Sequence, residues 1–278
     1  MTARATRFGT VVLTGATSGI GQATARRLAA ETSVLVLLGP EDELSVDPAL
    51  NQTRSAGSAI VHYVSADFAH LHEVVRAARE IRALVGQIDL LINDAGVPGA
   101  PERMVTSDGF ERTLQVNALA PALFTRLLVP SLADGARIVN VGSAAHHLGH
   151  FDFADIDVAN DYTSVMAYAS AKLAMVTWSS LLAEELGPLA VEVVALCPGL
   201  NATALSAAMA GSVGGPPAIG AERVLHAAIA TVASGSYLEN DRAVSPSREV
   251  LEPDNRARLA ELYWERLSPF TTGGEAAR

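Results

Sequence analysis

Tyr168 and Lys172 are the first candidates for chemistry, because they lie four positions apart in a segment whose pattern predicts a helix to about Leu186. Side chains at that spacing share one face of a helix. A tyrosine ordinarily has a pKa of about 10, and a neighbouring ammonium group favours the phenolate and lowers that pKa. The pair could therefore exchange a proton with a substrate near neutral pH. Taken alone, the spacing favours an ordinary surface pair, so the interpretation depends on further residues.

Two more polar residues stand where such a pair would need partners. Ser143 directly follows an apolar run at 138–141, which is typical of a buried strand. It is therefore expected at the carboxyl edge of a parallel sheet, where ligands bind in such folds. Asn117 is a poor helix former within an amphipathic helical run, which indicates that its side chain makes polar contacts inside the protein.

A glycine-rich turn follows the first predicted strand. Gly15, Gly19 and Gly21 fall within residues 14–21, and a helical stretch continues over 22–30. The unpaired N–H groups and the dipole at a helix N-terminus favour a pyrophosphate, and glycines allow its close approach to the backbone. The position of the turn at the first strand–helix junction predicts a dinucleotide site.

The elements that must position these residues alternate along the chain. Short apolar runs without polar alternation are typical of strands buried on both faces of a parallel sheet. Helical periodicity fills the intervals, for example over 71–85. The pattern predicts an α/β fold, a single doubly wound (Rossmann) parallel sheet with helices on both faces. The predicted strands are 11–13, 34–38, 60–64, 88–92, 138–141 and 191–196.

The organisation is predicted to be one dinucleotide-binding and catalytic domain over residues 1–278. Within it, 200–220 is expected to be a substrate loop and 240–278 a C-terminal extension. The segment 47–58 is polar, contains proline and glycine, and is expected to be a weak helix at best. The stretch 211–220, with two adjacent prolines, is expected to be a mobile loop.

Composition excludes several classes of protein. Apolar residues make up 49 % and charged residues 18 %, which argues against disorder. The net charge of −10 and the pI of about 5.1 argue against nucleic acid as a partner. No apolar run approaches the roughly 20 residues that span a bilayer, and the first residues lack the apolar core of a secretory signal. A cytoplasmic protein without a membrane partner is therefore expected.

A metal site is not expected. Cys197 is the single cysteine, which excludes an intrachain disulfide or a thiolate cluster and suits a small core residue. His146 and His147 are adjacent, and no carboxylates at ligand spacing accompany them. These histidines are expected to belong to a loop or to line a substrate pocket.

Together these motifs resemble the short-chain dehydrogenase/reductase family, whose cofactor signature is Thr-Gly-xxx-Gly-x-Gly, and the resemblance covers almost the whole chain. It implies that Asn117, Ser143, Tyr168 and Lys172 form the catalytic tetrad. Tyr168 would be the general acid/base and Ser143 would polarise the substrate carbonyl. Lys172 would bind the nicotinamide ribose and lower the pKa of Tyr168, and Asn117 would hold a water that relays the proton.

The resemblance also implies the residues of a dinucleotide site. Asp67 would contact the adenine and Thr203 the carboxamide. Asp94 departs from the family's Asn-Asn-Ala-Gly. The implied cofactor-binding residues, besides Tyr168 and Lys172, are Gly15, Thr17, Ser18, Gly19, Ile20, Gly21, Asp67, Phe68, Asn93, Ala95, Gly96, Pro198, Gly199 and Thr203.

The choice between NADP(H) and NAD(H) stays open. The family branch usually places a basic residue just after the second strand, where this chain has Gly39-Pro40-Glu41-Asp42. The two acids would repel a 2′-phosphate if they face it. Arg54 could still reach the site from the polar segment that follows.

The long interval between Ser143 and Tyr168, which includes Phe151 and Phe153, resembles the retinol-dehydrogenase-like branch. That resemblance implies a ketoreductase or alcohol dehydrogenase acting on the carbonyl or alcohol of a bulky, mostly apolar small molecule, with a tailoring step in secondary metabolism as one setting. The alternative is a catalytically silent dinucleotide-sensing or scaffold protein of the same fold. A nucleotide-sugar epimerase would need a larger C-terminal domain. Helical runs at 110–128 and 167–186 would form the family's usual dimer surface, so a homodimer or homotetramer is expected.

Overall fold

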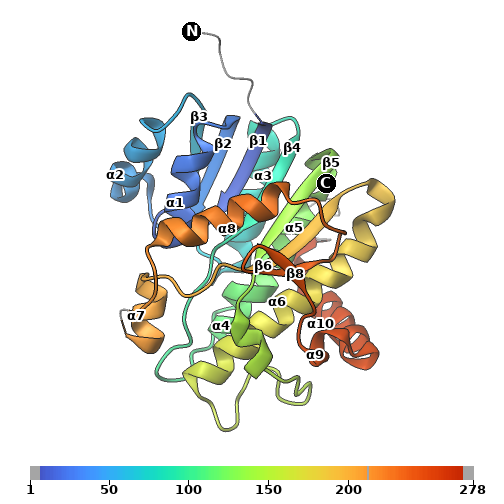
Figure 1. Cartoon of the computed structure of the whole chain (residues 1–278). Helices are drawn as coiled ribbons and strands as arrows, with labels where there is room; N and C mark the ends of the chain where they lie inside the picture. Colours follow the sequence, from blue (N-terminus) through green and yellow to red (C-terminus); the bar gives the residue numbers. More distant parts are fainter. Residues whose placement is uncertain (1–6, 212, 272–278) are drawn as a thin grey trace.

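The computed structural model describes residues 7–211 and 213–271, and its centre is a twisted eight-stranded sheet (Figure 1). The strand order is β3-β2-β1-β4-β5-β6-β7-β8, and all neighbours are parallel except β7 and β8. The predicted doubly wound parallel sheet is confirmed. The strands are β1 (Phe8–Thr14), β2 (Thr32–Gly39), β3 (Ile60–Ser65), β4 (Ile88–Asn93), β5 (Leu132–Val141), β6 (Glu192–Cys197), β7 (Tyr237–Glu239) and β8 (Arg242–Val244).

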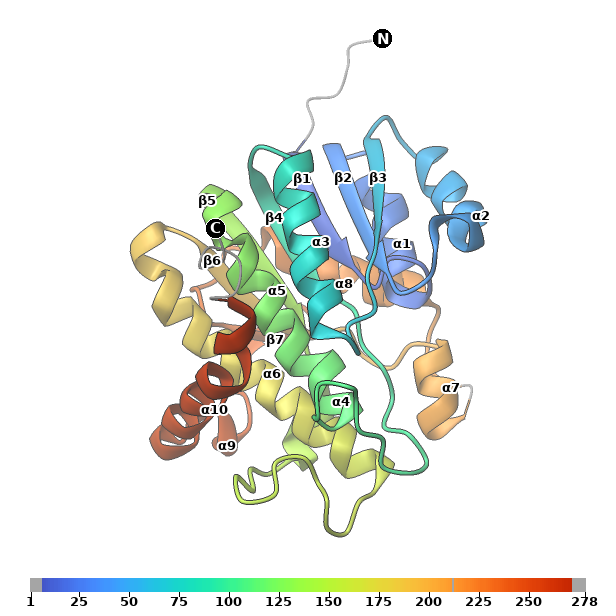
Figure 2. The ribbon, with the colours of Figure 1, turned by 180° about the vertical axis from the view of Figure 1, so that it is seen from behind.

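Helices cover both faces of the sheet. In Figure 1, α1 (Gly19–Leu28) and α8 (Pro217–Ile229) lie across one face, and in Figure 2, α3 (Leu71–Leu84) and α5 (Ala120–Leu128) lie across the other, followed by α6 (Ser164–Leu186). Alternate residues of a strand pack into opposite layers. Leu35 and Leu37 face the α1/α8 layer, and Val36 and Leu38 face the α3/α5/α6 layer. The edge strand β3 is only partly buried, so the expectation of burial on both faces is wrong for this strand.

Two segments that looked irregular in the sequence are helical. Residues 43–54 form α2 (Glu43–Arg54), although Pro48 lies inside it. The Asp42 side chain caps this helix by accepting a hydrogen bond from the Ser45 N–H, and Val46 and Leu50 are buried. Capping and burial therefore outweigh the cost of the proline, and the prediction of a weak helix was wrong.

The segment predicted to be a substrate loop is also partly helical. It contains α7 (Ala204–Ala210), capped by Thr203, and the first turn of α8, which begins at Pro217. A proline is well suited to the first turn of a helix because its missing N–H has no partner there. The predicted loop at 211–220 therefore ends several residues early.

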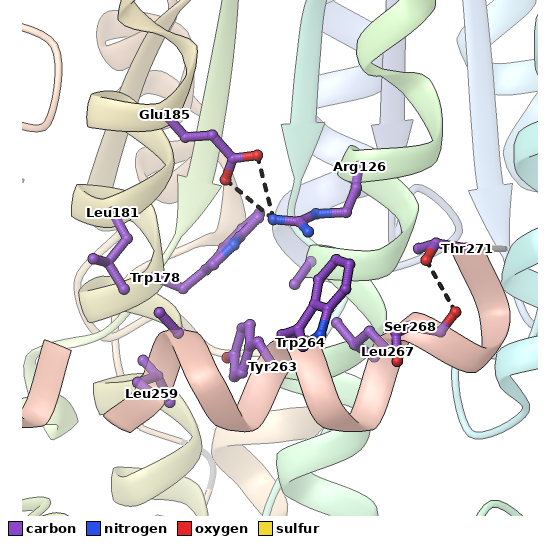
Figure 3. Close-up of a pocket in the computed structure, with 12 residues that line it drawn as sticks. Arg126, Trp178, Leu181, Glu185, Leu259, Tyr263, Trp264, Leu267, Ser268 and Thr271 are labelled. Atoms are coloured by element: carbon purple, nitrogen blue, oxygen red, sulfur yellow. Dashed lines mark hydrogen bonds and ion pairs between the residues drawn. The ribbon is translucent and has the colours of Figure 1, made fainter. Parts of the chain in front are cut away.

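The C-terminal extension forms β8, α9 (Arg248–Leu251) and α10 (Pro253–Thr271), and α10 packs against α5 and α6. Figure 3 shows Tyr263 and Trp264 of α10 facing Trp178 and the Arg126–Glu185 ion pair of α5 and α6 around a cavity of about 70 Å³. The helical runs expected to form a dimer surface thus face α10. A dimer built on both helices would have to displace α10.

One helix is longer than expected, since no apolar run was expected to approach the roughly 20 residues that span a bilayer. The stretch Ser164–Leu189 is long and apolar enough to cross a membrane by length and composition, with a mean hydropathy of 1.2. However, 78 % of the 18-residue window that meets this criterion is buried inside the protein, where α6 packs on β6 and α10. Its apolar character is that of a core helix.

Candidate active site

The tyrosine, serine and lysine predicted to act together meet at the carboxyl end of β5. Ser143 follows this strand, and its side chain is hydrogen-bonded to the Tyr168 hydroxyl from α6. One turn further along α6, Lys172 donates from Nζ to the carbonyl of Val141 at 2.8 Å. Tyr168 and Lys172 are both buried, so this is not a surface pair.

Asn117, the fourth residue of the predicted tetrad, comes from a segment before α5. It lies in a π-helical turn, Gln115–Leu119, between α4 (Arg112–Leu114) and α5. Its side chain accepts from the Val97 N–H at 2.8 Å and donates to the Val97 carbonyl at 2.9 Å. A π-helical turn is frequently found at functional sites. Asn117 therefore fixes the segment after β4, and a Cβ on Gly96 would lie 3.0 Å from Asn117 Oδ1 and 3.6 Å from Lys172 Nζ. The predicted water relay stays a prediction.

The electrostatics of the pair differ from the sequence expectation. Burial raises the pKa of Tyr168 to about 12, and the hydrogen bond to Ser143 lowers it only in part. Burial also lowers the pKa of Lys172 to about 8, against the attraction of Asp94, which raises it. Here the pKa of Tyr168 lies above rather than below its ordinary value, because desolvation raises it most, the charge of Asp94 raises it further, and only Ser143 opposes them.

The glycine turn has the geometry that a pyrophosphate needs. Gly15 and Gly19 have φ values of +70° and +55°, which favour glycine. A Cβ on Gly21 would lie 2.1 Å from the Gly15 carbonyl oxygen, so the turn closes only with glycine there. Ser18 is the N-cap of α1, and its side chain makes no capping hydrogen bond in the described part of the chain. The N-terminus of α1 is thus suited to an anion such as the pyrophosphate of a dinucleotide.

Asp94 lies directly behind this turn. Its carboxylate accepts a hydrogen bond from the Gly21 N–H and lies close enough to Lys172 to be attracted by it. Thr14 Oγ1 accepts from the N–H groups of Asp94 and Ala95 at 3.1 and 3.0 Å, which ties β4 to β1 at the point where the strand order reverses. Burial raises the pKa of Asp94 to about 7. The departure at position 94 therefore places an ionisable group between the glycine turn and the lysine.

The other residues predicted after β1, β3 and β4 fall into two groups. Thr17 packs against Gly39 at the end of β2, and Ile20 packs against Gly220 of α8, so both line the glycine turn. Asp67 is half-buried after β3, and its carboxylate accepts from the Ala69 N–H.

Two of the predicted cofactor residues face the core instead. Asn93 is fully buried and donates to Thr125 and Asn140, and the Phe68 ring packs on Phe124. Only their backbone atoms are left to face a ligand.

The loop after β6 is organised by a residue that the sequence analysis missed. Asn201 donates to the carbonyls of Pro198 and Gly199 and accepts from the Gly220 N–H. Thr203, whose hydroxyl caps α7, lies near the glycine turn, because its methyl group would be 3.3 Å from a Cβ on Gly19. An asparagine two residues after a Pro-Gly pair was the available signal, since asparagine often bonds nearby backbone groups.

The geometry agrees with the comparison of sequences. The family model described as short chain dehydrogenase matches residues 9–212. The chain belongs to this family. Mouse retinol dehydrogenase 13 is 32 % identical over 271 residues, which is 90 % of this chain and 81 % of that protein. Mouse polyprenol dehydrogenase is 40 % identical over 170 residues, which is 59 % of this chain but only 50 % of that protein.

Solved structures agree on the fold of this short-chain dehydrogenase. A structure from Mycobacterium paratuberculosis, described as uncharacterised, has a TM-score of 0.79, 29 % identity, and coverage of 94 % and 93 % of the two chains. A short-chain dehydrogenase from Burkholderia cenocepacia in complex with NADP has a TM-score of 0.66, 23 % identity, and coverage of 83 % and 95 %. Human retinol dehydrogenase 13, at 37 % identity, is matched over 60 % of its length, so this dehydrogenase spans only part of several relatives.

The end of β2 is acidic, because Glu41 and Asp42 follow it closely. Tyr63 donates to the Glu41 carbonyl, and the pKa of Tyr63 is raised by burial and by the charges of Glu41 and its neighbours. Arg54 does not reach this region, because it pairs with Glu43 at 3.2 Å and with Asp47 at 3.6 Å. The suggestion that Arg54 could reach the site of a 2′-phosphate is therefore wrong for this structure.

The structure brings a carboxylate to the two histidines, which the sequence did not predict. Glu239 of β7 lies 3.6 Å from His147 Nε2, and ligand atoms of His146, His147 and Glu239 lie within 4.8 Å of one another. However, His146 uses Nδ1 with the Ser143 carbonyl and Nε2 with the Ser247 N–H. A metal ion would have to break one of these bonds, and the expectation of no metal stays a prediction.

Proposed function

We propose that this short-chain dehydrogenase transfers a hydride between a nicotinamide dinucleotide and the carbonyl or alcohol of a bulky, mostly apolar molecule. The observation that carries the proposal is that Ser143 at the carboxyl end of β5 lies beside the buried Tyr168, with the buried Lys172 one helical turn away. A chain that only sensed a dinucleotide would not need this arrangement. The glycine turn at the N-terminus of α1 lies across the same edge of the sheet.

The residues supply the proton chemistry of the reaction. When bound, the nicotinamide gives or takes the hydride at the substrate carbon. The Ser143 hydroxyl donates a hydrogen bond to the substrate oxygen and polarises the carbonyl. Tyr168 donates its proton to that oxygen as the alcohol forms, and Lys172 holds a positive charge beside it.

The pKa of Tyr168 supports the direction of reduction. With a pKa of about 12, its phenol is protonated across the physiological range. A protonated phenol is the general acid that carbonyl reduction requires, whereas alcohol oxidation requires the phenolate. Tyr168 is therefore suited to act as the general acid in the reduction of a ketone or aldehyde.

An apolar substrate is supported by the loops at the carboxyl edge. Met104 after β4, Leu148 after β5 and Leu200 after β6 are all exposed large apolar side chains. Phe151 and Phe153 stack on each other at 5.0 Å and pack against the core and Arg258 of α10. The apolar surface offered to a substrate thus comes from the loops and not from these rings.

The acidic end of β2 favours NAD(H) over NADP(H) in this proposal. Glu41 and Asp42 stand where a 2′-phosphate would need a cation, and Arg54 is engaged elsewhere. Like charges repel, so NADPH should bind more weakly than NADH. The cytoplasmic location and the setting in secondary metabolism stay predictions.

The experiment is a fluorescence titration with NADH and NADPH, followed by turnover of aromatic, steroid-like and polyketide-like ketones. Tyr168→Phe should lower kcat by about 10²–10⁴-fold while leaving the Kd of the dinucleotide within about threefold. Tyr162→Phe is the matched control, because the Tyr162 hydroxyl donates to the Ala100 carbonyl outside the tetrad. Tight binding without turnover across the panel would favour the sensor, and binding of neither dinucleotide would refute the proposal.

A further inference from the structure

His146 lies directly behind Ser143 and uses both of its ring nitrogens for backbone groups. Its side chain is fully buried, with Nδ1 at 2.7 Å from the Ser143 carbonyl oxygen and Nε2 at 3.1 Å from the Ser247 nitrogen. A backbone N–H can only donate, so Nε2 must accept. Nδ1 therefore carries the proton and donates it to Ser143, and only the neutral Nδ1–H tautomer satisfies both contacts.

The surroundings of His146 hold it in the neutral form. Burial lowers its pKa, and the neighbouring His147 lowers it further, while the Ser143 carbonyl and Glu239 oppose this shift. The Tyr237 ring meets the imidazole edge-on at 4.8 Å, and the Tyr237 hydroxyl is bonded to Glu239. A protonated imidazole would have no acceptor for Ser247.

The bond to His146 holds the peptide that carries the catalytic serine. Three hydrogen bonds hold the peptide unit between Ser143 and Ala144. Its carbonyl accepts from His146 Nδ1 and also from the His146 backbone N–H at 3.1 Å, and its N–H donates to Cys197 Sγ at 3.2 Å. With both ends of this unit fixed, the Ser143 side chain has a defined direction, toward the Tyr168 hydroxyl and the Ala145 N–H.

The opposite side of His146 is anchored in the C-terminal extension, 101 positions along the chain from the histidine. Ser247 immediately precedes α9, whose Val250 is buried against α6. The next acidic residue, Glu249, accepts from the Phe151 N–H at 3.3 Å. The extension thus holds the segment after Ser143 at two points.

We propose that His146 is a positioning residue. It links the Ser247 backbone to the Ser143–Ala144 peptide by two hydrogen bonds and so orients the Ser143 hydroxyl. This inference rests on the proposed function, since it concerns the hydroxyl that binds the substrate oxygen. It also assigns the C-terminal extension a part in catalysis, although no hydrogen bond or ion pair joins its described residues, 240–271, to the tetrad.

Two substitutions separate the two bonds of the imidazole. His146→Asn places an amide N–H near the position of Nδ1 and keeps the donor to Ser143, but leaves the Ser247 N–H without an acceptor. His146→Gln carries an amide oxygen toward the position of Nε2 and keeps the bond to Ser247, but loses the donor to Ser143. His147→Gln is the control, because His147 is more exposed and contacts neither backbone group.

Turnover and dinucleotide binding should be measured for all three variants. We expect His146→Gln to lower kcat about 10–100-fold, the range that a small misplacement of a catalytic group costs, with the Kd of the dinucleotide unchanged. His146→Asn should lower kcat less, by about fivefold, because it keeps the side-chain donor to Ser143 but loses the bond to Ser247, and His147→Gln should stay within twofold. Equal losses of kcat in His146→Asn and His146→Gln, or no loss in either, would overturn the proposal. If the His146 side chain only filled space in the core, the two amides would not differ in their effect.

A second measurement on the wild-type protein decides the inference if the variants unfold or if no ketone is reduced. Imidazole ¹⁵N NMR should show His146 neutral at neutral pH, with the proton on Nδ1, and its protonation should need a lower pH than that of an ordinary histidine. The Nε2–H tautomer, or titration near the usual pKa of about 6.5, would overturn the positioning role. A wild type that binds dinucleotide without turnover but shows the Nδ1–H tautomer would refute only the proposed function.

Discussion

We predict a pH-dependent effect of replacing Asp94 by asparagine. The unfolding free energy of the variant minus that of the wild type should be larger at neutral pH than at acidic pH. The carboxylate accepts from the Gly21 N–H and is attracted by Lys172, but burial raises its pKa to about 7 from the ordinary value of 3.8. The carboxamide has nearly the same shape and keeps an oxygen for Gly21. The substitution therefore removes a charge without removing the hydrogen bond.

The size of the effect follows from the two pKa values. In the folded protein Asp94 binds its proton more tightly than in the unfolded chain, so the wild type loses stability as the pH rises from about 4 through about 7. A rise of about three pKa units corresponds to about 4 kcal/mol. Asp94 is only half-buried, and the variant also loses the attraction to Lys172, so we expect about 2 kcal/mol to remain.

The assay is urea unfolding of both proteins at several pH values between 4.5 and 8, followed by tryptophan fluorescence. The unfolding free energy of Asp94→Asn minus that of the wild type should increase by about 2 kcal/mol across this range, and groups shared by both proteins cancel in the difference. Asp134→Asn, at an exposed position, is the control and should show a constant difference. A difference for Asp94→Asn that stays constant within about 0.5 kcal/mol, below the effect expected from linkage, would refute the assignment of a raised pKa.

Three further results are expected. Gly21→Ala should weaken dinucleotide binding more than about 100-fold in a fluorescence titration, since the added Cβ would lie 2.1 Å from the Gly15 carbonyl oxygen; unchanged binding would show that the turn is not the pyrophosphate site. Arg266→Ala should cost about 3 kcal/mol and lower Tm by about 10 °C, because it leaves the Asp157 carboxylate half-buried without its ion pair; a change below 2 °C would count against this. Sedimentation should give the mass of a single chain, 28.9 kDa, because α10 packs against both α5 and α6, whereas a dimer cross-linked through those helices would contradict the packing.

Much of the fold and the tetrad could be predicted because the relevant signals are local. Parallel strands buried on both faces produce continuous apolar runs, and each of the predicted runs overlaps a strand of the structure, although the last, 191–196, begins one residue before β6. Within the glycine turn, Gly21 is required by a local contact, because a Cβ there would lie 2.1 Å from the Gly15 carbonyl oxygen. The Tyr168–Lys172 spacing is set by the period of one helix, and Ser143 is placed by the end of one strand.

The short strands β7 and β8 and the role of the extension could not be predicted in this way. A three-residue strand such as Tyr237–Glu239 carries no periodicity, and it forms because β6 offers it an open edge. Similarly, α2 forms around Pro48 because the sheet edge buries one side of it. Such elements depend on partners that are distant in the sequence.

The sequence by itself determined the order of the elements, the glycine turn and the identity of the residues that meet at the carboxyl edge. Only the tertiary structure decided the pKa values of these residues and the hydrogen bonds that hold them in place. The pKa values of Tyr168, Lys172 and Asp94 depend on burial by several elements at once, and the bond from His146 to Ser247 joins residues 101 positions apart. Local patterns specify backbone conformation, whereas desolvation and long-range hydrogen bonds exist only once the whole chain has packed.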